Sequence, residues 1–130
     1  MPNASNIIVQ NASAADKTFE VLTPSGGDGG VARFALKEGA APVAFPSMTV
    51  MARPTTNASR KTSVKVHVPH TYNDPVTGLL KKGPAFELNV EASMPDAYPE
   101  DARDDAVAYG VNLVASTLMR QVFRDGYGLV

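Results

Sequence analysis

The sequence predicts an α+β domain in which strands occupy the first two-thirds of the chain and helices follow. Polar and apolar side chains alternate in several segments before Ser93, which is the period of strands with one buried face. After Ser93, apolar residues recur three and four positions apart, as in an amphipathic helix. The chain has 130 residues, so we expect one domain that covers residues 1–130.

The clearest alternation lies in residues 59–69. The apolar and β-branched residues fall on one face: Thr62, Val64, Val66 and Val68. The polar and basic residues fall on the other: Lys61, Ser63, Lys65 and His67. This pattern predicts a half-buried antiparallel strand with an open, basic face.

Five other segments have strand patterns: residues 6–10, 17–23, 31–37, 47–53 and 85–92. The first two are separated by small and polar residues, which predicts an N-terminal hairpin. The glycine-rich residues 24–30 exclude a regular element. Residues 42–46 are expected to lead into an extended segment that Pro54 stops. Turn-forming residues predict a loop over 70–83.

The helical region is expected to start near Asp96 and Pro99 and to end at Asp125-Gly126. Acidic residues follow the expected start, where the helix dipole favours them: Glu100, Asp101, Asp104 and Asp105. Gly110 and the Ser116-Thr117 pair permit either a bend in one long helix or a joint between two helices.

The net charge of −1 hides an uneven distribution. Residues 31–90 carry a net charge of +5, whereas residues 1–30 carry −2 and residues 91–130 carry −4. A basic middle segment favours a surface that meets an anion such as a nucleic acid, although a solvated surface of unequal loops would give the same pattern.

Several function classes find no support. The chain has no Cys, which excludes a disulfide scaffold, a thiolate zinc site and a cysteine nucleophile. His67 and His70 lack further ligands nearby, so we expect no metal and no cofactor. There is no visible nucleophile–base pair, and we expect no enzyme activity. No apolar run is long enough to span a membrane and no leader is recognisable, so we expect a cytosolic protein.

A single C-terminal helical segment is little cover for six strands. A symmetric dimer would solve this packing problem, because the helix of each copy can lie across the sheet of the other. The second sheet face would stay open and polar. Such a face, with basic side chains, is a plausible platform for unpaired RNA bases.

Three stretches, in this order, resemble the coat proteins of small single-stranded RNA bacteriophages of the levivirus type. The most similar is Arg60-Lys61-Thr62-Ser63-Val64-Lys65-Val66-His67-Val68-Pro69. Gly30-Val31-Ala32-Arg33-Phe34 resembles an upstream strand of the family, and Leu88-Asn89-Val90-Glu91 resembles the strand that precedes its helices. The likeness in order, spacing and length extends over essentially the whole chain.

The resemblance implies an N-terminal β-hairpin, a five-stranded antiparallel sheet and C-terminal helices that interlock two copies into a homodimer. It implies a structural capsid protein whose dimers assemble, in the bacterial host cytoplasm, into the icosahedral T=3 shell of a virion. The implied partners are other copies of the chain and single-stranded viral RNA, with no membrane. In the family, an operator hairpin bound to the inner sheet face represses replicase translation and nucleates packaging.

The RNA-binding positions of the family correspond here to Thr49, Met51, Arg53, Lys61, Ser63, Lys65, Glu87 and Asn89. Two of these depart from the family pattern: Met51 stands where a hydroxyl is common, and Glu87 where a Tyr can stack on a base. A lost stacking ring removes about 1–3 kcal/mol per base, so we expect generic contacts with genomic RNA. The alternatives are a non-viral dimeric RNA-binding module with an open sheet, and a small dimeric α+β enzyme.

Overall fold

A computed structural model describes residues 2–39 and 41–129. The chain divides into two compact units, Met1–Pro95 and Asp96–Val130. The first unit contains the strands β1 (Ile7–Gln10), β2 (Asp16–Thr23), β3 (Val31–Ala35), β4 (Ser47–Pro54), β5 (Ser59–Asn73) and β6 (Leu80–Pro95). The second contains the helices α1 (Glu100–Val114) and α2 (Thr117–Asp125). The order of strands and helices predicted from the sequence is confirmed.

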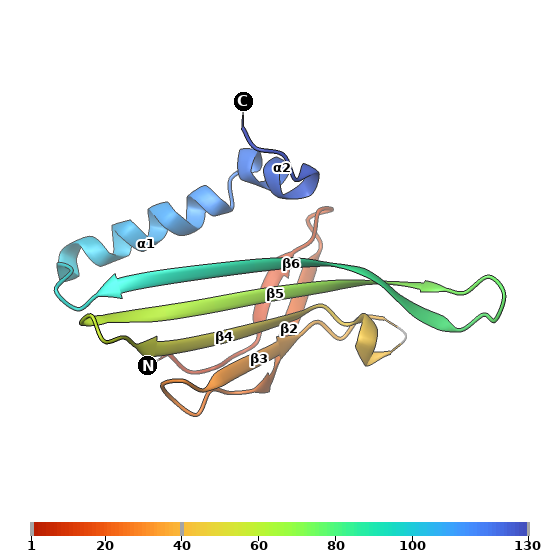
Figure 1. Cartoon of the computed structure of the whole chain (residues 1–130), viewed down its shortest axis with the longest axis horizontal. Helices are drawn as coiled ribbons and strands as arrows, with labels where there is room; N and C mark the ends of the chain where they lie inside the picture. Colours follow the sequence, from red (N-terminus) through yellow and green to blue (C-terminus); the bar gives the residue numbers. More distant parts are fainter. Residues whose placement is uncertain (1, 40, 130) are drawn as a thin grey trace. The chain divides into compact units, whose positions relative to one another are not determined.

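The six strands form one antiparallel sheet in chain order (Figure 1). β2 belongs to two parts of this sheet. Its first half pairs with β1, from Asp16 opposite Gln10 to Phe19 opposite Ile7, and its second half pairs with β3. The result is the predicted N-terminal hairpin joined to a five-stranded antiparallel sheet, β2 to β6.

β5 and β6 form a long hairpin that continues past β4 (Figure 1). The prediction of a loop over residues 70–83 is wrong, because Thr71, Tyr72 and Asn73 pair with Lys82, Lys81 and Leu80. The turn-forming residues do form a turn, but it is confined to residues 74–79. The carboxylate of Asp74 accepts the backbone N–H of Val76 at 2.8 Å, and this hydrogen bond closes the turn.

One further boundary differs from the sequence prediction, and one segment without a predicted element contains a short helix. Pro42–Ala44, which leads into β4, is a 3-10 helix, because Pro42 supplies the φ angle and first-turn position that a helix start tolerates. β3 ends at Ala35 rather than at residue 37, and Leu36 instead donates its backbone N–H to the carbonyl of Pro46.

The second unit has two helices, which decides between the two possibilities left open by the sequence. α1 runs through Gly110 without interruption and ends at Val114. Ser116 then has an extended backbone, and its hydroxyl accepts the backbone N–H of Met119 at 3.4 Å, as an N-cap. Gly126 ends α2 with a left-handed φ of 75°, a conformation that glycine adopts without strain.

Few side chains are buried in this fold. Among the described residues, the buried apolar side chains are those of Ala32, Phe34 and Ala35, all on β3, and neither helix contains a buried residue. No helix in the described part of the chain is both long enough and apolar enough to cross a membrane.

Candidate nucleic-acid interface

The strand register brings the eight candidate RNA-binding residues onto one face of the sheet, because directly opposed residues of antiparallel strands share a face. They lie in four neighbouring rows that cross β4, β5 and β6. These rows are Ser47–His67–Glu87, Thr49–Lys65–Asn89, Met51–Ser63–Glu91 and Arg53–Lys61–Ser93. We call this surface the polar face. The alternation in residues 59–69 correctly predicted it.

Exposure differs among these residues. Arg53, Lys65, Glu87 and Asn89 are exposed, and Thr49, Met51, Lys61 and Ser63 are half-buried. Thr49 and Ser63 offer hydroxyls, and Asn89 offers both a donor and an acceptor. The polar face therefore combines positive charge with groups that suit phosphate oxygens and base edges.

Two carboxylates on the polar face are engaged by basic groups of β5. The Nζ atom of Lys61 lies 3.3 Å from Oε2 of Glu91, and Nδ1 of His67 lies 3.3 Å from Oε1 of Glu87. Sequence reasoning placed His67 on the polar face of its strand and named Glu91 within the stretch that resembles the family, but it included neither residue in the site. The register was the missing signal, since it brings Glu91 beside Lys61 from the neighbouring row.

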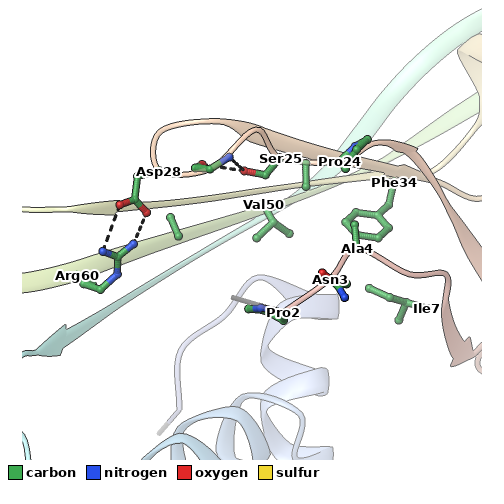
Figure 2. Close-up of a pocket in the computed structure, with 13 residues that line it drawn as sticks. Pro2, Asn3, Ala4, Ile7, Pro24, Ser25, Asp28, Phe34, Val50 and Arg60 are labelled. Atoms are coloured by element: carbon green, nitrogen blue, oxygen red, sulfur yellow. Dashed lines mark hydrogen bonds and ion pairs between the residues drawn. The ribbon is translucent and has the colours of Figure 1, made fainter.

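The opposite face of the same sheet is apolar and carries Met48, Val50, Val64, Val66 and Leu88. A hollow of about 740 Å³ opens on this face. Its floor is formed by Ala32, Phe34, Val50 and Ala52. Figure 2 shows Phe34 and Val50 pointing from the sheet toward the segment that holds Pro2, Asn3 and Ala4.

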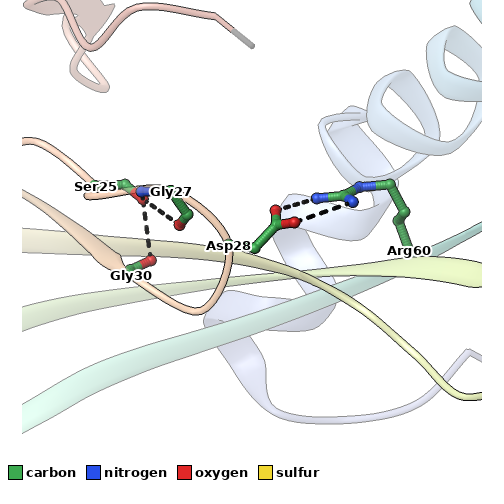
Figure 3. Close-up of polar contacts among 5 residues, drawn as sticks. All are labelled: Ser25, Gly27, Asp28, Gly30 and Arg60. Carbon is green, nitrogen blue, oxygen red and sulfur yellow. Dashed lines mark hydrogen bonds and ion pairs between the residues drawn. The ribbon is translucent and has the colours of Figure 1, made fainter.

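An ion pair borders the hollow. Asp28, in the loop between β2 and β3, pairs with the guanidinium of Arg60 at the start of β5 (Figures 2 and 3). The loop is folded on itself, because the hydroxyl of Ser25 donates to the carbonyl of Gly27 at 2.8 Å and accepts the N–H of the same residue (Figure 3). The backbone N–H of Gly29 donates a hydrogen bond to the carbonyl of Ala52 at 2.9 Å, which holds the loop against β4.

The described residues contain no group of three His, Cys, Asp or Glu side chains that could hold a metal ion. Their hydrogen bonds include no pairing of a hydroxyl with a histidine that would suit nucleophilic catalysis. The candidate functional feature of the described residues is therefore a sheet with one polar, basic face and one apolar face.

Comparison with known proteins agrees with these features. The sequence profile described as levivirus coat protein matches residues 2–128. Comparison with curated protein sequences gave no match.

Several solved structures share the fold. The virus-like particle of bacteriophage NT-214 is 18% identical over 98% of both chains, with a TM-score of 0.82. That of Beihai levi-like virus 21 is also 18% identical, over 99% of both chains, with a TM-score of 0.83. The protein capsid of bacteriophage GA is 15% identical over 96% of both chains, with a TM-score of 0.74. The chain therefore belongs to the levivirus coat protein family and is a structural capsid protein of a virion, not an enzyme.

Proposed function

We propose that this coat protein forms a homodimer, that the dimers close into an icosahedral T=3 shell, and that the polar face packages single-stranded genomic RNA inside it. Assembly takes place in the cytoplasm of the bacterial host. The observation that carries this proposal is the two-sided sheet, with basic and hydrogen-bonding groups on one face and exposed apolar groups on the other. Membership of the capsid family favours this function over a non-viral RNA-binding module.

The need for a second copy follows from the small core. On the apolar sheet face, Phe86 is 47% exposed and Val68 is 38% exposed. On the helices, Val111 is 61% exposed and Leu113 is 67% exposed. Exposed apolar surface on this scale marks an interaction site. A second copy provides both a matching sheet face and a matching helical unit, and twofold symmetry lets the helices of each cover the sheet of the other.

The edge of β6 supports the same partner. β6 is 16 residues long and stands last in the strand order, so among the described strands only β5 pairs with it. A long edge strand presents unpaired backbone groups that readily accept another strand. Antiparallel pairing with β6 of a second copy would satisfy those groups and join the two polar faces into one surface.

The RNA proposal rests on the composition of the polar face. Arg53 and Lys65 are exposed and form no ion pair with any described residue. Free basic groups of this kind neutralise phosphates and give an affinity that is independent of sequence and falls with salt. Asn89 lies directly opposite Lys65, where its amide can read a base edge.

The identity of residue 87 bears on translational repression. Glu87 is exposed, and its carboxylate contacts His67. A glutamate side chain has no aromatic ring on which a base can stack. We therefore propose that generic contacts with genomic RNA dominate, and that any repression of replicase translation through an operator hairpin is weak.

Electron microscopy after expression in bacteria tests the shell. We expect uniform closed shells that contain nuclease-protected RNA. A dimer that stays free at every concentration, even with RNA added, would contradict the proposal.

A paired-variant experiment tests the RNA face. Arg53→Gln with Lys65→Gln should lower the RNA content of the particles while dimers still form. Lys17→Gln with Lys37→Gln removes the same charge from cations paired with Glu38 and Glu20, and should leave RNA content nearly unchanged. Equal RNA uptake by both variants would place the RNA-binding surface elsewhere.

The helical contribution to the dimer is tested by Leu118→Asp. Leu118 is 54% exposed on α2, and a carboxylate there should weaken the dimer, as measured by sedimentation at several concentrations. Gln121→Asp is the control, because Gln121 is an exposed polar residue of the same helix. Unchanged dimerisation of Leu118→Asp would exclude this part of α2 from the interface.

A further inference from the structure

The basic residues of the polar face divide into paired and unpaired groups. Lys61 is held by Glu91 and His67 by Glu87. Arg33, Arg53 and Lys65 make no ion pair with any residue in the described part of the chain. These three unpaired cations lie on three neighbouring strands: Arg33 on β3, Arg53 on β4 and Lys65 on β5.

Arg33 extends the polar face onto β3, because it lies directly opposite Thr49. Arg33 adds a fourth member to the row Thr49–Lys65–Asn89, so this row of side chains crosses the four strands β3 to β6. Arg33 is exposed, as are Lys65 and Asn89 in the same row. Adjacent strands are about 4.8 Å apart, so the backbones at Arg33 and Lys65 are separated by roughly twice that distance.

The surroundings of Arg33 leave its guanidinium available. Its neighbours on the polar face are Val31 and Ala35 along β3, Thr49 on β4 and Thr23 on β2, and none of these is acidic. The carboxylate of Glu20, which lies opposite Ala35, is engaged by Lys37 at 2.9 Å. A guanidinium without a carboxylate partner is suited to bidentate contact with a phosphate.

We propose that Arg33 is a further RNA-contacting residue and that an RNA strand crosses the sheet along the row Arg33–Thr49–Lys65–Asn89. This inference rests on the proposed RNA-binding function of the polar face. Arg33 and Lys65 each neutralise a phosphate, the Thr49 hydroxyl between them donates to a phosphate or ribose oxygen, and Asn89 faces a base edge. Lys61 contributes little net charge, because Glu91 already neutralises it.

The test is the salt dependence of binding between purified dimers and a short uridine oligonucleotide. For single-stranded nucleic acid, each lost phosphate contact reduces the slope of log affinity against log salt by about 0.7. We expect this loss for Arg33→Gln and for Lys65→Gln, and a much smaller change for Lys61→Gln. Arg33→Lys keeps the charge and should retain most of the wild-type slope.

The possible results separate this inference from the proposed function. A wild-type dimer whose binding does not depend on salt would overturn RNA binding by the polar face altogether. A second result is that the affinity of the wild-type dimer depends on salt and that Lys65→Gln reduces the slope, but that Arg33→Gln leaves the slope unchanged. This result would overturn only the role of Arg33. If Arg33→Gln blocks shell closure but keeps the wild-type slope, Arg33 contacts another coat protein, and the inference is also wrong.

Discussion

Lys61 and Glu91 form an ion pair across β5 and β6, with 3.3 Å between Nζ and Oε2. The two residues are diagonal neighbours, since Lys61 is directly opposite Ser93 and Glu91 is directly opposite Ser63. Four residues along β5, Lys65 is opposite the uncharged Asn89. Two lysines on the same face of one strand therefore differ in the charge that they can offer to RNA.

Glu91→Gln should strengthen RNA binding. The substitution keeps the shape of the side chain, removes its negative charge and releases Lys61 for a phosphate, so the salt slope should rise by about 0.7. The slope can be measured with purified dimers and a uridine oligonucleotide. Glu38→Gln removes a carboxylate that is paired with Lys17 outside the four rows and serves as the control. A slope no steeper than that of the control would show that Lys61 does not reach the RNA even when it is free.

The alternation of residues was sufficient to predict the faces of the sheet but not the partners within them. Period-two patterns place Lys61 and Lys65 on one face whatever the neighbouring strand is. Whether either lysine is neutralised depends on the register of β6, which local sequence does not determine. Arg33 was missed as a site residue for the same reason, because only the pairing of β3 with β4 puts it in line with Lys65.

The two incorrect or open boundaries also have physical causes. In residues 70–83 the turn formers are concentrated at the tip, and the pairing of Tyr72 with Lys81 extends the ladder through residues that are not typical of turns. At the helix joint, Ser116 competes with the helical backbone: its hydroxyl donates to the carbonyl of Leu113 and accepts the N–H of Met119. A serine in a helical pattern does not by itself reveal which option it adopts.

Ala58→Gly should stabilise the turn between β4 and β5. Ala58 has a φ of 52°, in the left-handed region, which costs a non-glycine residue about 1–2 kcal/mol. Glycine removes this strain, at an entropic cost of about 0.5–1 kcal/mol. Thermal or denaturant unfolding should therefore show a net gain of about 0.5–1 kcal/mol. The matched control is Ala92→Gly, in the extended strand β6, which should destabilise. Equal effects at both positions would mean that Ala58 is not strained.

Substitutions of Phe34 and Phe86 together test whether a second copy covers the apolar sheet face. Phe34 is 6% exposed and Phe86 is 47% exposed. Phe34→Ala should lower the free energy of unfolding by about 3–5 kcal/mol through loss of buried contacts. Phe86→Ala should cost less than about 0.5 kcal/mol if its surface stays exposed to solvent. In a dimer that covers this face, its cost should approach that of Phe34→Ala, as measured by denaturant unfolding. A small effect of Phe86→Ala in a stable dimer would show that the partner leaves this residue uncovered.

The tip of the β5–β6 hairpin should depend on pH through Asp74. The Lys81 ammonium, whose Nζ lies 2.6 Å from Oδ2, and the N–H of Val76 hold the pKa of Asp74 below its ordinary value of 3.8. A carboxyl with a depressed folded-state pKa contributes stability at higher pH and loses it as the pH falls through that pKa. The turn at residues 74–79 should therefore stay closed at neutral pH and open only in acid below 3.8.

Carboxyl NMR of Asp74 measures this effect directly. In Lys81→Met the largest cause of the depression is removed, so the pKa of Asp74 should rise toward its ordinary value and the turn should open at a higher pH. Lys82→Met is the control, because Lys82 forms no ion pair with any residue that the structure describes. It should leave the titration of Asp74 unchanged. If Lys81→Met and Lys82→Met shift the pKa of Asp74 equally, the cause is the general positive charge of the hairpin rather than the ion pair with Lys81.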